Sequence, residues 1–289
     1  MGGTPGCLTE RTPRVKVTRA PEEGQTGHYC VPVPPPEPLP RIEATAYLTP
    51  LREGGSLPGL VEASDLGTYV VKFTGAGQGP KALVAEIVVG ELGRAIGVDI
   101  PALALIEVDA ELGRREPDEE VQELVSASAG LNLAVDFLPG AVGYDAGFDV
   151  PAEQAARVVW LDALVANVDR SARNTNLLVW HRALWAIDHG ACLRFHHAWG
   201  RPESFASSRY RYDDHVLARV GDPRRVHAEL AEQVTPELLG SVLDLVPDAW
   251  LLPDPTRPDP KAPADAAGAR QAYADYLLAR LAAAERWLP

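Results

Sequence analysis

The segment "NVDRSARNTNLLVWHRALWAIDHG" (Asn167–Gly190) places an acid and three amides before two short apolar runs and an acid, Asp188, after them. The runs "LLVW" and "ALWAI" are typical of strands, and only His181-Arg182 separates them. A two-residue loop pairs Trp180 with Ala183 and fixes the register of the hairpin. The segment therefore predicts a short antiparallel hairpin whose open end carries polar residues.

The open end of this hairpin gathers oxygen-bearing side chains. In the predicted register Asp188 lies opposite Thr175, with Asn174 and Asn176 as its neighbours. Carboxylate and amide oxygens suit Mg²⁺, which needs few protein ligands, and Asp169 lies on the loop that leads into the first strand. Aspartate and asparagine are also common in turns for backbone reasons alone. The pattern predicts a metal site and leaves open whether Asn174 or Asn176 is the ligand.

The composition sets limits on the function. A chain of 289 residues with 46% hydrophobic and 23% charged residues is typical of a soluble globular protein of one large or two modest domains. The net charge of −13 argues against broad binding to nucleic acid or acidic membranes. Three cysteines are too few for a disulfide framework, and neither a signal peptide nor a membrane-spanning run is evident. We therefore expect a cytoplasmic protein without membrane insertion or direct nucleic-acid binding.

The chain is predicted to have three parts. Residues 1–40 end in "VPVPPPEPLP" and read as a flexible, Pro-rich arm. Residues 41–140 read as an antiparallel sheet with one helix, and 141–289 as mostly helical apart from the hairpin. Within 41–140 the expected elements are a strand over 41–51, a turn over 52–67, a strand over 68–73, a helix over 81–96, an acidic surface segment over 110–125, and strands over 101–109 and 129–140.

One lysine and one glutamate of this sheet-and-helix part could act together. Lys72 ends the strand "TYVVKF", where it is either an edge lysine that discourages aggregation or a cation that reaches a phosphate. On the following helix Glu86 shares a narrow stripe with Gly90 and Gly93, whereas Glu91 lies about 140° away. Small residues allow close packing, so Glu86 is the better partner for Lys72.

Two glycine-rich stretches could meet an anion. "EGGSLPGL" (53–60) contains Gly54, Gly55 and Ser56, whose backbone N–H groups could face phosphate oxygens. "GAGQG" (75–79) opens a helix, but neither stretch has the spacing of a Walker A loop or a dinucleotide fingerprint.

These pieces follow one another in the order found in protein kinases: glycine loop, strand lysine, helix glutamate, Asp-x₄-Asn, then Asp-x-Gly after a hairpin. "VDRSARN" with "AIDHG" resembles the HipA-like kinases and, in this segment, the phosphoinositide kinases. "EGGSLPGLVEASDLGTYVVKFTGAGQGPKALVAE" resembles the bacterial HipA-like kinase domain, and the resemblance covers residues 42–245. It implies an α+β, bilobal protein-kinase-like fold with an N-lobe over 41–140 and a helical C-lobe over 141–289.

The resemblance also implies residue roles. Lys72 would hold the ATP phosphates, oriented by Glu86, and Asp169 would accept the proton of the substrate hydroxyl or align it. Asn174 and Asp188 would coordinate Mg²⁺, with Asn176 as the alternative amide. The remaining implied contacts are Gly54, Gly55 and Ser56 with the phosphates, Asn132, Ala134 and Asp136 of the hinge strand with the nucleotide, and Asn167 as a brace of the catalytic loop.

The chain departs from the kinase pattern in three places. No His-Arg precedes Asp169, and Asp188-His189-Gly190 stands where Asp-Phe-Gly is usual, so conventional activation-loop control is not expected. The first 40 residues do not resemble the N-terminal module of HipA toxins. Ser56 lies near the place of the serine that HipA autophosphorylates.

The leading hypothesis is an ATP- and Mg²⁺-dependent phosphotransferase that acts on a hydroxyl of a protein or a small molecule. The alternative is a pseudokinase that binds nucleotide or serves as a scaffold with little turnover. The loop over 196–214 is the expected acceptor side, and its Arg201, Arg209 and Arg211 are either solvated or face an anionic substrate.

A metalloenzyme built on His189, His196 and His197 with Asp188 is a further reading. It has little support in the sequence, because adjacent histidines should diverge and no His-x₃-His spacing occurs.

Overall fold

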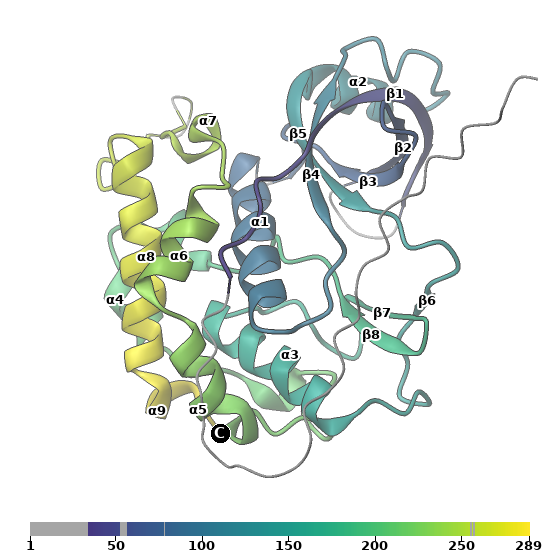
Figure 1. Ribbon diagram of the computed structural model, residues 1–289. Helices are drawn as coiled ribbons and strands as arrows, with labels where there is room; N and C mark the ends of the chain where they lie inside the picture. The colour runs from purple at the N-terminus through teal and green to yellow at the C-terminus, as the bar shows by residue number, and fades with distance from the viewer. Residues whose placement is uncertain (1–33, 53–56, 78, 255, 257) are drawn as a thin grey trace, which may run out of the picture. The chain divides into compact units, whose positions relative to one another are not determined.

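Contacts divide the chain into Met1–Val31 and Pro32–Pro289. The computed structural model describes residues 34–289 except 53–56, 78, 255 and 257 (Figure 1). Most of the predicted N-terminal arm, residues 1–33, therefore lies outside the described residues.

The first half of the described chain forms a closed barrel in the order β1-β2-β3-β5-β4. All its neighbouring strands are antiparallel except β1 and β4, which run parallel. Alternate side chains such as Val61, Val71 and Ile106 are fully buried in its interior. The strands are β1 (Arg41–Pro50), β2 (Gly59–Ala63), β3 (Thr68–Lys72), β4 (Leu103–Val108) and β5 (Gly130–Asp136).

One prediction for this half is wrong, and one helix was not predicted. The predicted turn over 52–67 contains β2, because "GLVEA" alternates between buried and exposed positions and pairs with both β1 and β3. The acidic segment over 110–125 runs into the helix α2 (Glu119–Ala127), whose first turn is capped by Asp118 Oδ1 accepting from Glu120 N–H at 3.1 Å. Val121 and Val125 of α2 pack against the barrel core.

The helix α1 (Pro80–Ala95) lies between the barrel and the helices α6 and α8 (Figure 1). Eleven consecutive residues, Leu83–Gly93, are buried, so its whole circumference is covered in that stretch. A Cβ on Gly93 would stand 2.5 Å from Ile100 Cδ1 and 2.8 Å from Leu161 Cδ2, so a larger residue there would require both side chains to shift. The small residues of α1 thus allow close packing of the helix, and this packing fixes the position of Glu86.

The second half is mostly helical around a large apolar core, with one small sheet in the order β6-β7-β8. Within the described ranges no helix is long and apolar enough to span a bilayer. In chain order the elements are β6 (Val142–Gly143), α3 (Ala152–Val165), β7 (Leu177–Trp180), β8 (Ala183–Ala186), η1 (Arg194–His197), α4 (Pro202–Ala206), η2 (Tyr212–Asp214), α5 (Arg224–Gln233), α6 (Pro236–Leu243), α7 (Asp248–Leu251), α8 (Ala266–Ala282) and α9 (Ala284–Trp287).

Candidate active site

Lys72 at the end of β3 is held between two carboxylates. Its Nζ donates to Glu86 Oε1 of α1 and, at 2.7 Å, to Asp188 Oδ1. Burial alone would lower the pKa of Lys72, but the two carboxylates outweigh burial and raise that pKa above its ordinary value. Burial would likewise raise the pKa of Asp188, and the Lys72 ammonium instead holds it at about 2. The charged pair of Lys72 and Asp188 is therefore stable across the neutral range.

The hairpin has the register expected from its two-residue loop. Trp180 pairs with Ala183, and Leu177 pairs with Ala186. His181 and Arg182 both have positive φ, at 49° and 67°, as a tight hairpin turn of this twist requires. One step beyond the ladder, Ile187 N–H donates to Asn176 O at 3.0 Å, and the chain then turns at Asp188, whose φ is 55°.

The two amides of the open end both contact Asp169. Asn174 Nδ2 donates to Asp169 Oδ2 at 3.0 Å, and Asn176 Nδ2 donates to the Asp169 carbonyl at 2.8 Å. With their nitrogens so engaged, the Oδ1 atoms of the two amides are the groups left for a cation. Together with Asp188 they form the hard, oxygen-only donor set that suits a divalent ion such as Mg²⁺. The residues present thus fit a metal, and the choice between the two amides stays open.

A buried carboxylate that the sequence analysis missed organises the loop around Asp169. Asp162 of α3 is fully buried and accepts from Asn167 Nδ2 at 2.8 Å, from Arg170, and from His215 Nε2 at 2.9 Å. Asn167 Oδ1 in turn accepts from Asp169 N–H at 2.9 Å, which is the bracing role implied for Asn167. The one sequence feature that indicates this network is the acidic Asp162 within the otherwise apolar helical stretch "VVWLDALV".

A cavity of about 920 Å³ opens next to Lys72. Its lining includes Lys72, Asn174, Asn176 and Asp188, and Asp169 contacts the lining residue Asn174. The rest of the lining is largely apolar and comes from both halves of the chain, with Val70, Val135, Phe137, Leu138, Leu178 and Ile187 among its members. Charged groups together with an apolar slot, formed by these apolar side chains, suit a nucleotide.

Only part of strand β5, where the resemblance implies nucleotide contacts, lines the cavity. Asp136 lines the cavity, whereas Asn132 and Ala134 are fully buried and do not. Ala134 belongs to the barrel core, and Asn132 Oδ1 accepts from Thr74 N–H at 2.8 Å. The side chains of Asn132 and Ala134 share the inward face of β5, and residues 135–138 line the cavity instead. The predicted phosphate contacts Gly54, Gly55 and Ser56 lie outside the described residues.

The histidines of the metalloenzyme reading are arranged differently from the prediction. His196 and His197 do not diverge, because the 3₁₀ turn η1 brings their Nε2 atoms to 3.0 Å. His196 Nδ1 also contacts Tyr273 Oη at 2.7 Å. In the part of the chain that the structure covers, no three His, Cys, Asp or Glu side chains converge in a way that could hold a metal.

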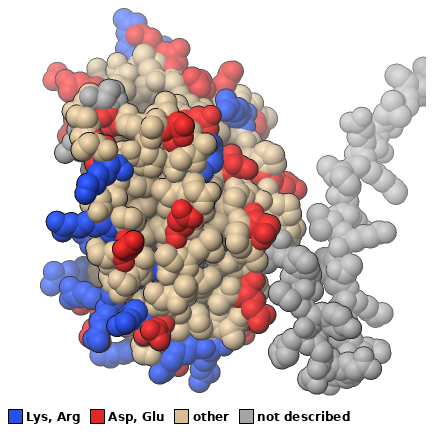
Figure 2. Space-filling model, turned by 90° about the vertical axis from the view of Figure 1, so that its left-hand side faces the viewer, with Lys and Arg blue, Asp and Glu red and all other residues tan. Residues whose placement is uncertain are grey.

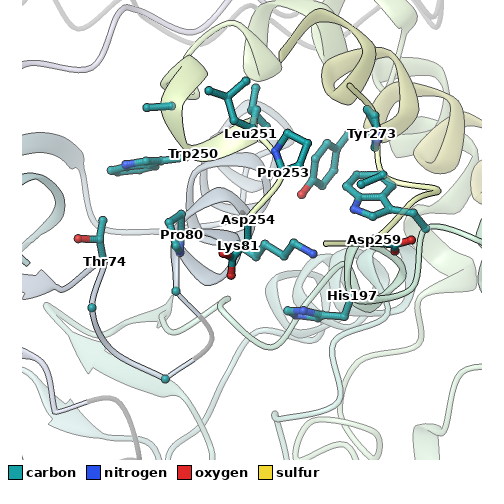
Figure 3. A pocket seen from close by; sticks show the side chains of 18 residues that line it. Thr74, Pro80, Lys81, His197, Trp250, Leu251, Pro253, Asp254, Asp259 and Tyr273 are labelled. Atoms are coloured by element: carbon teal, nitrogen blue, oxygen red, sulfur yellow. The ribbon is translucent and has the colours of Figure 1, made fainter. Parts of the chain in front are cut away.

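A second cavity of about 920 Å³ lies at the first turn of α1 (Figure 3). It is lined by Trp199, Trp250 and Tyr273 together with Lys81, whose Nζ donates to His196 O at 2.5 Å. It shares no lining residue with the Lys72 cavity, and of the sequence candidates it contains only Gly75, Gly77 and Gly79 of the second glycine-rich stretch and His197. The candidate kinase chemistry therefore belongs to the Lys72 cavity.

The predicted acceptor loop carries exposed arginines. Arg201, Arg209 and Arg211 are all exposed, and Arg211 forms an ion pair with Asp214 at 2.5 Å. On the face shown in Figure 2, Lys and Arg side chains gather along one edge of the lower half. Because Arg211 has an acidic partner, an anionic substrate does not follow from these arginines alone.

The architecture of a barrel with two helices followed by a helical half, with the cavity lined by a strand lysine and by the Asp of an Asp-x-Gly segment, defines a bilobal α+β protein-kinase-like fold. The proinflammatory kinase CtkA of Helicobacter pylori shares this fold, with a TM-score of 0.50, 11% sequence identity, and coverage of 82% of this chain and 92% of that chain. The predicted fold class is thus confirmed.

A model of the HipA-like kinase family matches residues 46–273, so the chain belongs to this family and is a kinase. A structure of the Golgi casein kinase has a TM-score of 0.41 at 13% identity, with 88% of this chain and 76% of that chain covered. The same kinase with Mn/ADP bound has a TM-score of 0.38 at 12% identity, with coverage of 86% and 73%. The curated proteins contain no match.

Proposed function

We propose that this kinase transfers the γ-phosphate of ATP, with Mg²⁺, to a hydroxyl group of a protein or small molecule. The observation that carries the proposal is that Lys72, Asn174, Asn176 and Asp188 line one cavity next to Asp169. The family membership supports phosphate transfer in general. A cavity with this local cation can bind a polyanion despite the net charge of −13.

In this proposal the residues act by positioning and charge. Lys72, held by Glu86, binds the ATP phosphates, and the backbone of residues 135–138 borders the adenine. Asp169 aligns the acceptor hydroxyl and takes its proton as the oxygen forms a bond to the γ-phosphorus. The bond from that phosphorus to the β,γ-bridging oxygen breaks, and its electron pair leaves with ADP. A divalent ion held by Asp188 and one amide would neutralise phosphate charge.

The proposal is tested by phosphate transfer from Mg·ATP. Wild type and Asp169→Ala are incubated alone and with cell extract, and mass spectrometry detects phosphate on protein and small molecules. We expect Asp169→Ala to transfer about 100- to 10,000-fold more slowly, and the exposed-loop variant Asp145→Ala to match wild type. Equal transfer by wild type and Asp169→Ala would contradict the assigned mechanism, and nucleotide binding without ADP release would favour a pseudokinase.

The metal amide is tested by comparing two alanine variants. The Asp-x₄-Asn spacing favours Asn174 as the ligand, so we expect Asn174→Ala to raise the half-saturating Mg²⁺ concentration about tenfold. Asn176→Ala should instead lower kcat at saturating Mg²⁺, because Asn176 Nδ2 holds the Asp169 carbonyl at 2.8 Å. Rates measured against Mg²⁺ at fixed ATP separate the two, and the reverse pattern assigns the metal to Asn176.

A further inference from the structure

Arg170 occupies an unusual place for an arginine next to a catalytic aspartate. Its side chain is fully buried, and so is the carboxylate of Asp162, with which its Nε and Nη2 form a two-point ion pair. A buried ion pair contributes little net stability over apolar packing, because desolvation offsets most of the attraction. The pair is therefore better explained by what its geometry holds in place.

The rest of the guanidinium reaches the open end of the hairpin. Nη1 donates to the carbonyl of Asn176 and, at 3.2 Å, to the carbonyl of Ile187. These two residues are themselves joined by the last hydrogen bond of the hairpin, Ile187 N–H to Asn176 O at 3.0 Å. One nitrogen of the Arg170 guanidinium thus binds both strands of the hairpin at its open end, next to the metal-ligand candidates Asn176 and Asp188.

A further contact extends to the Asp-His-Gly segment. Arg170 Nη2 lies 3.3 Å from His189 Nδ1. A guanidinium can only donate hydrogen bonds, so His189 Nδ1 is the acceptor in this contact. His189 is the residue after Asp188, so the position of Asp188 depends on this contact.

We propose that Arg170 is a positioning residue that sets Asp169 relative to the metal-ligand candidates Asn176 and Asp188. Arg170 directly follows Asp169 in the chain, so the contacts that hold its side chain also restrain the backbone of Asp169. Only the planar, five-donor fork of arginine can hold a carboxylate, two carbonyls and an imidazole at once. The inference rests on the proposed function, because it concerns the same site.

The test compares Arg170→Lys with Arg280→Lys. Arg280 is equally buried and is held by carbonyls, including Ala163 O at 2.6 Å next to Asp162 in the chain, yet its partners all lie outside the site. Lysine at either position keeps a positive charge and loses the fork. Mn²⁺ affinity is measured in the presence of ADP from the free-Mn²⁺ signal in electron paramagnetic resonance, alongside thermal unfolding and steady-state rates.

We expect Arg170→Lys to weaken Mn²⁺ binding about 10- to 100-fold and to lower kcat by a similar factor. The KM for ATP should stay within about twofold, because Lys72 and the apolar slot are untouched. Arg280→Lys should lower the unfolding temperature but leave Mn²⁺ affinity at the wild-type level. Wild-type Mn²⁺ affinity in Arg170→Lys, or equal losses in both variants, would overturn the inference.

A second variant and a comparison of binding with activity separate the remaining outcomes. If Arg170→Lys does not fold, His189→Leu removes one arginine contact while the ion pair with Asp162 remains; it should weaken Mn²⁺ binding in the same direction, and unchanged binding would overturn the proposal. Mn²⁺ binding that depends on Arg170 in a protein that transfers no phosphate would contradict only the proposed function. A wild type that transfers phosphate as fast as Arg170→Lys would contradict only the inference.

Discussion

Lys72→Met is expected to lower kcat/KM for ATP about 100- to 1,000-fold, the usual loss when a charge-stabilising donor is removed from an active site. Lys72 is the cation bonded to both Glu86 and Asp188 at the cavity, so methionine removes the phosphate contact and the link between α1 and the Asp-His-Gly segment. Steady-state kinetics measure the loss. The matched control is Lys261→Met, an exposed lysine on a loop, which should leave the rate unchanged.

The same variant should change the pH dependence of folding. In wild type the folded pKa of Asp188 is about 2, below its ordinary value near 3.9, so its stabilising contribution is present above pH 4 and is lost as the pH falls toward 2. Without Lys72 the buried Glu86 and the nearby Asp188 face each other uncompensated, and their pKa values rise. Uncompensated buried charge costs about 3–5 kcal/mol, an upper limit here because Glu86 can take up a proton.

Urea unfolding of wild type and Lys72→Met at pH 7.5 and pH 4.5 measures this effect. The stability deficit of the variant should be larger at pH 7.5, where both carboxylates are charged, than at pH 4.5. A variant that keeps more than about a tenth of the wild-type kcat/KM would contradict the role of Lys72. A deficit that grows toward pH 4.5 would contradict the charge assignment.

Local periodicity made part of this site predictable. A two-residue loop between apolar runs leaves one register for the hairpin, and the pairing of Trp180 with Ala183 follows from it. The glycine stripe of α1 likewise pointed to Glu86 as the lysine's partner, because glycines mark the face of close approach. Both features depend on residues near one another in the chain.

Features that depend on distant pairing were not predictable. The barrel closes through the parallel pairing of β1 with β4, two strands that lie far apart in the sequence. Which side chains of β5 point into the barrel, such as those of Asn132 and Ala134, is determined only once the barrel has closed. Asp162 and His215 are 53 residues apart and meet through an isolated bridge between the catalytic loop and a later segment. No spacing rule within one element connects such residues.

Breaking the buried pair of Asp162 and Arg170 is expected to have the largest effect on stability. Asp162→Leu leaves the guanidinium without its carboxylate, and Asn167 and His215 without their acceptor. Removing one partner of a buried ion pair costs about 3–5 kcal/mol. The Arg170 and His215 partners, outweighing burial, hold the pKa of Asp162 far below its usual range, so its contribution is fully present above about pH 4 and decreases progressively as the pH falls below that. Urea unfolding should therefore show a full deficit at pH 7 and a smaller one at pH 3.5.

The double variant Asp162→Leu/Arg170→Met separates stability from positioning. Removing both charges also removes the uncompensated one, so the double variant should be at least about 2 kcal/mol more stable than Asp162→Leu, although the two orphaned donors keep it below wild type. Its kcat should nevertheless stay as low as that of Arg170→Lys, because methionine cannot hold the carbonyls of Asn176 and Ile187. Strictly additive stability losses would show that the pair is not coupled. Recovery of kcat together with stability would show that the pair supports only the fold, because a positioning role requires activity to remain lost after the stability has returned.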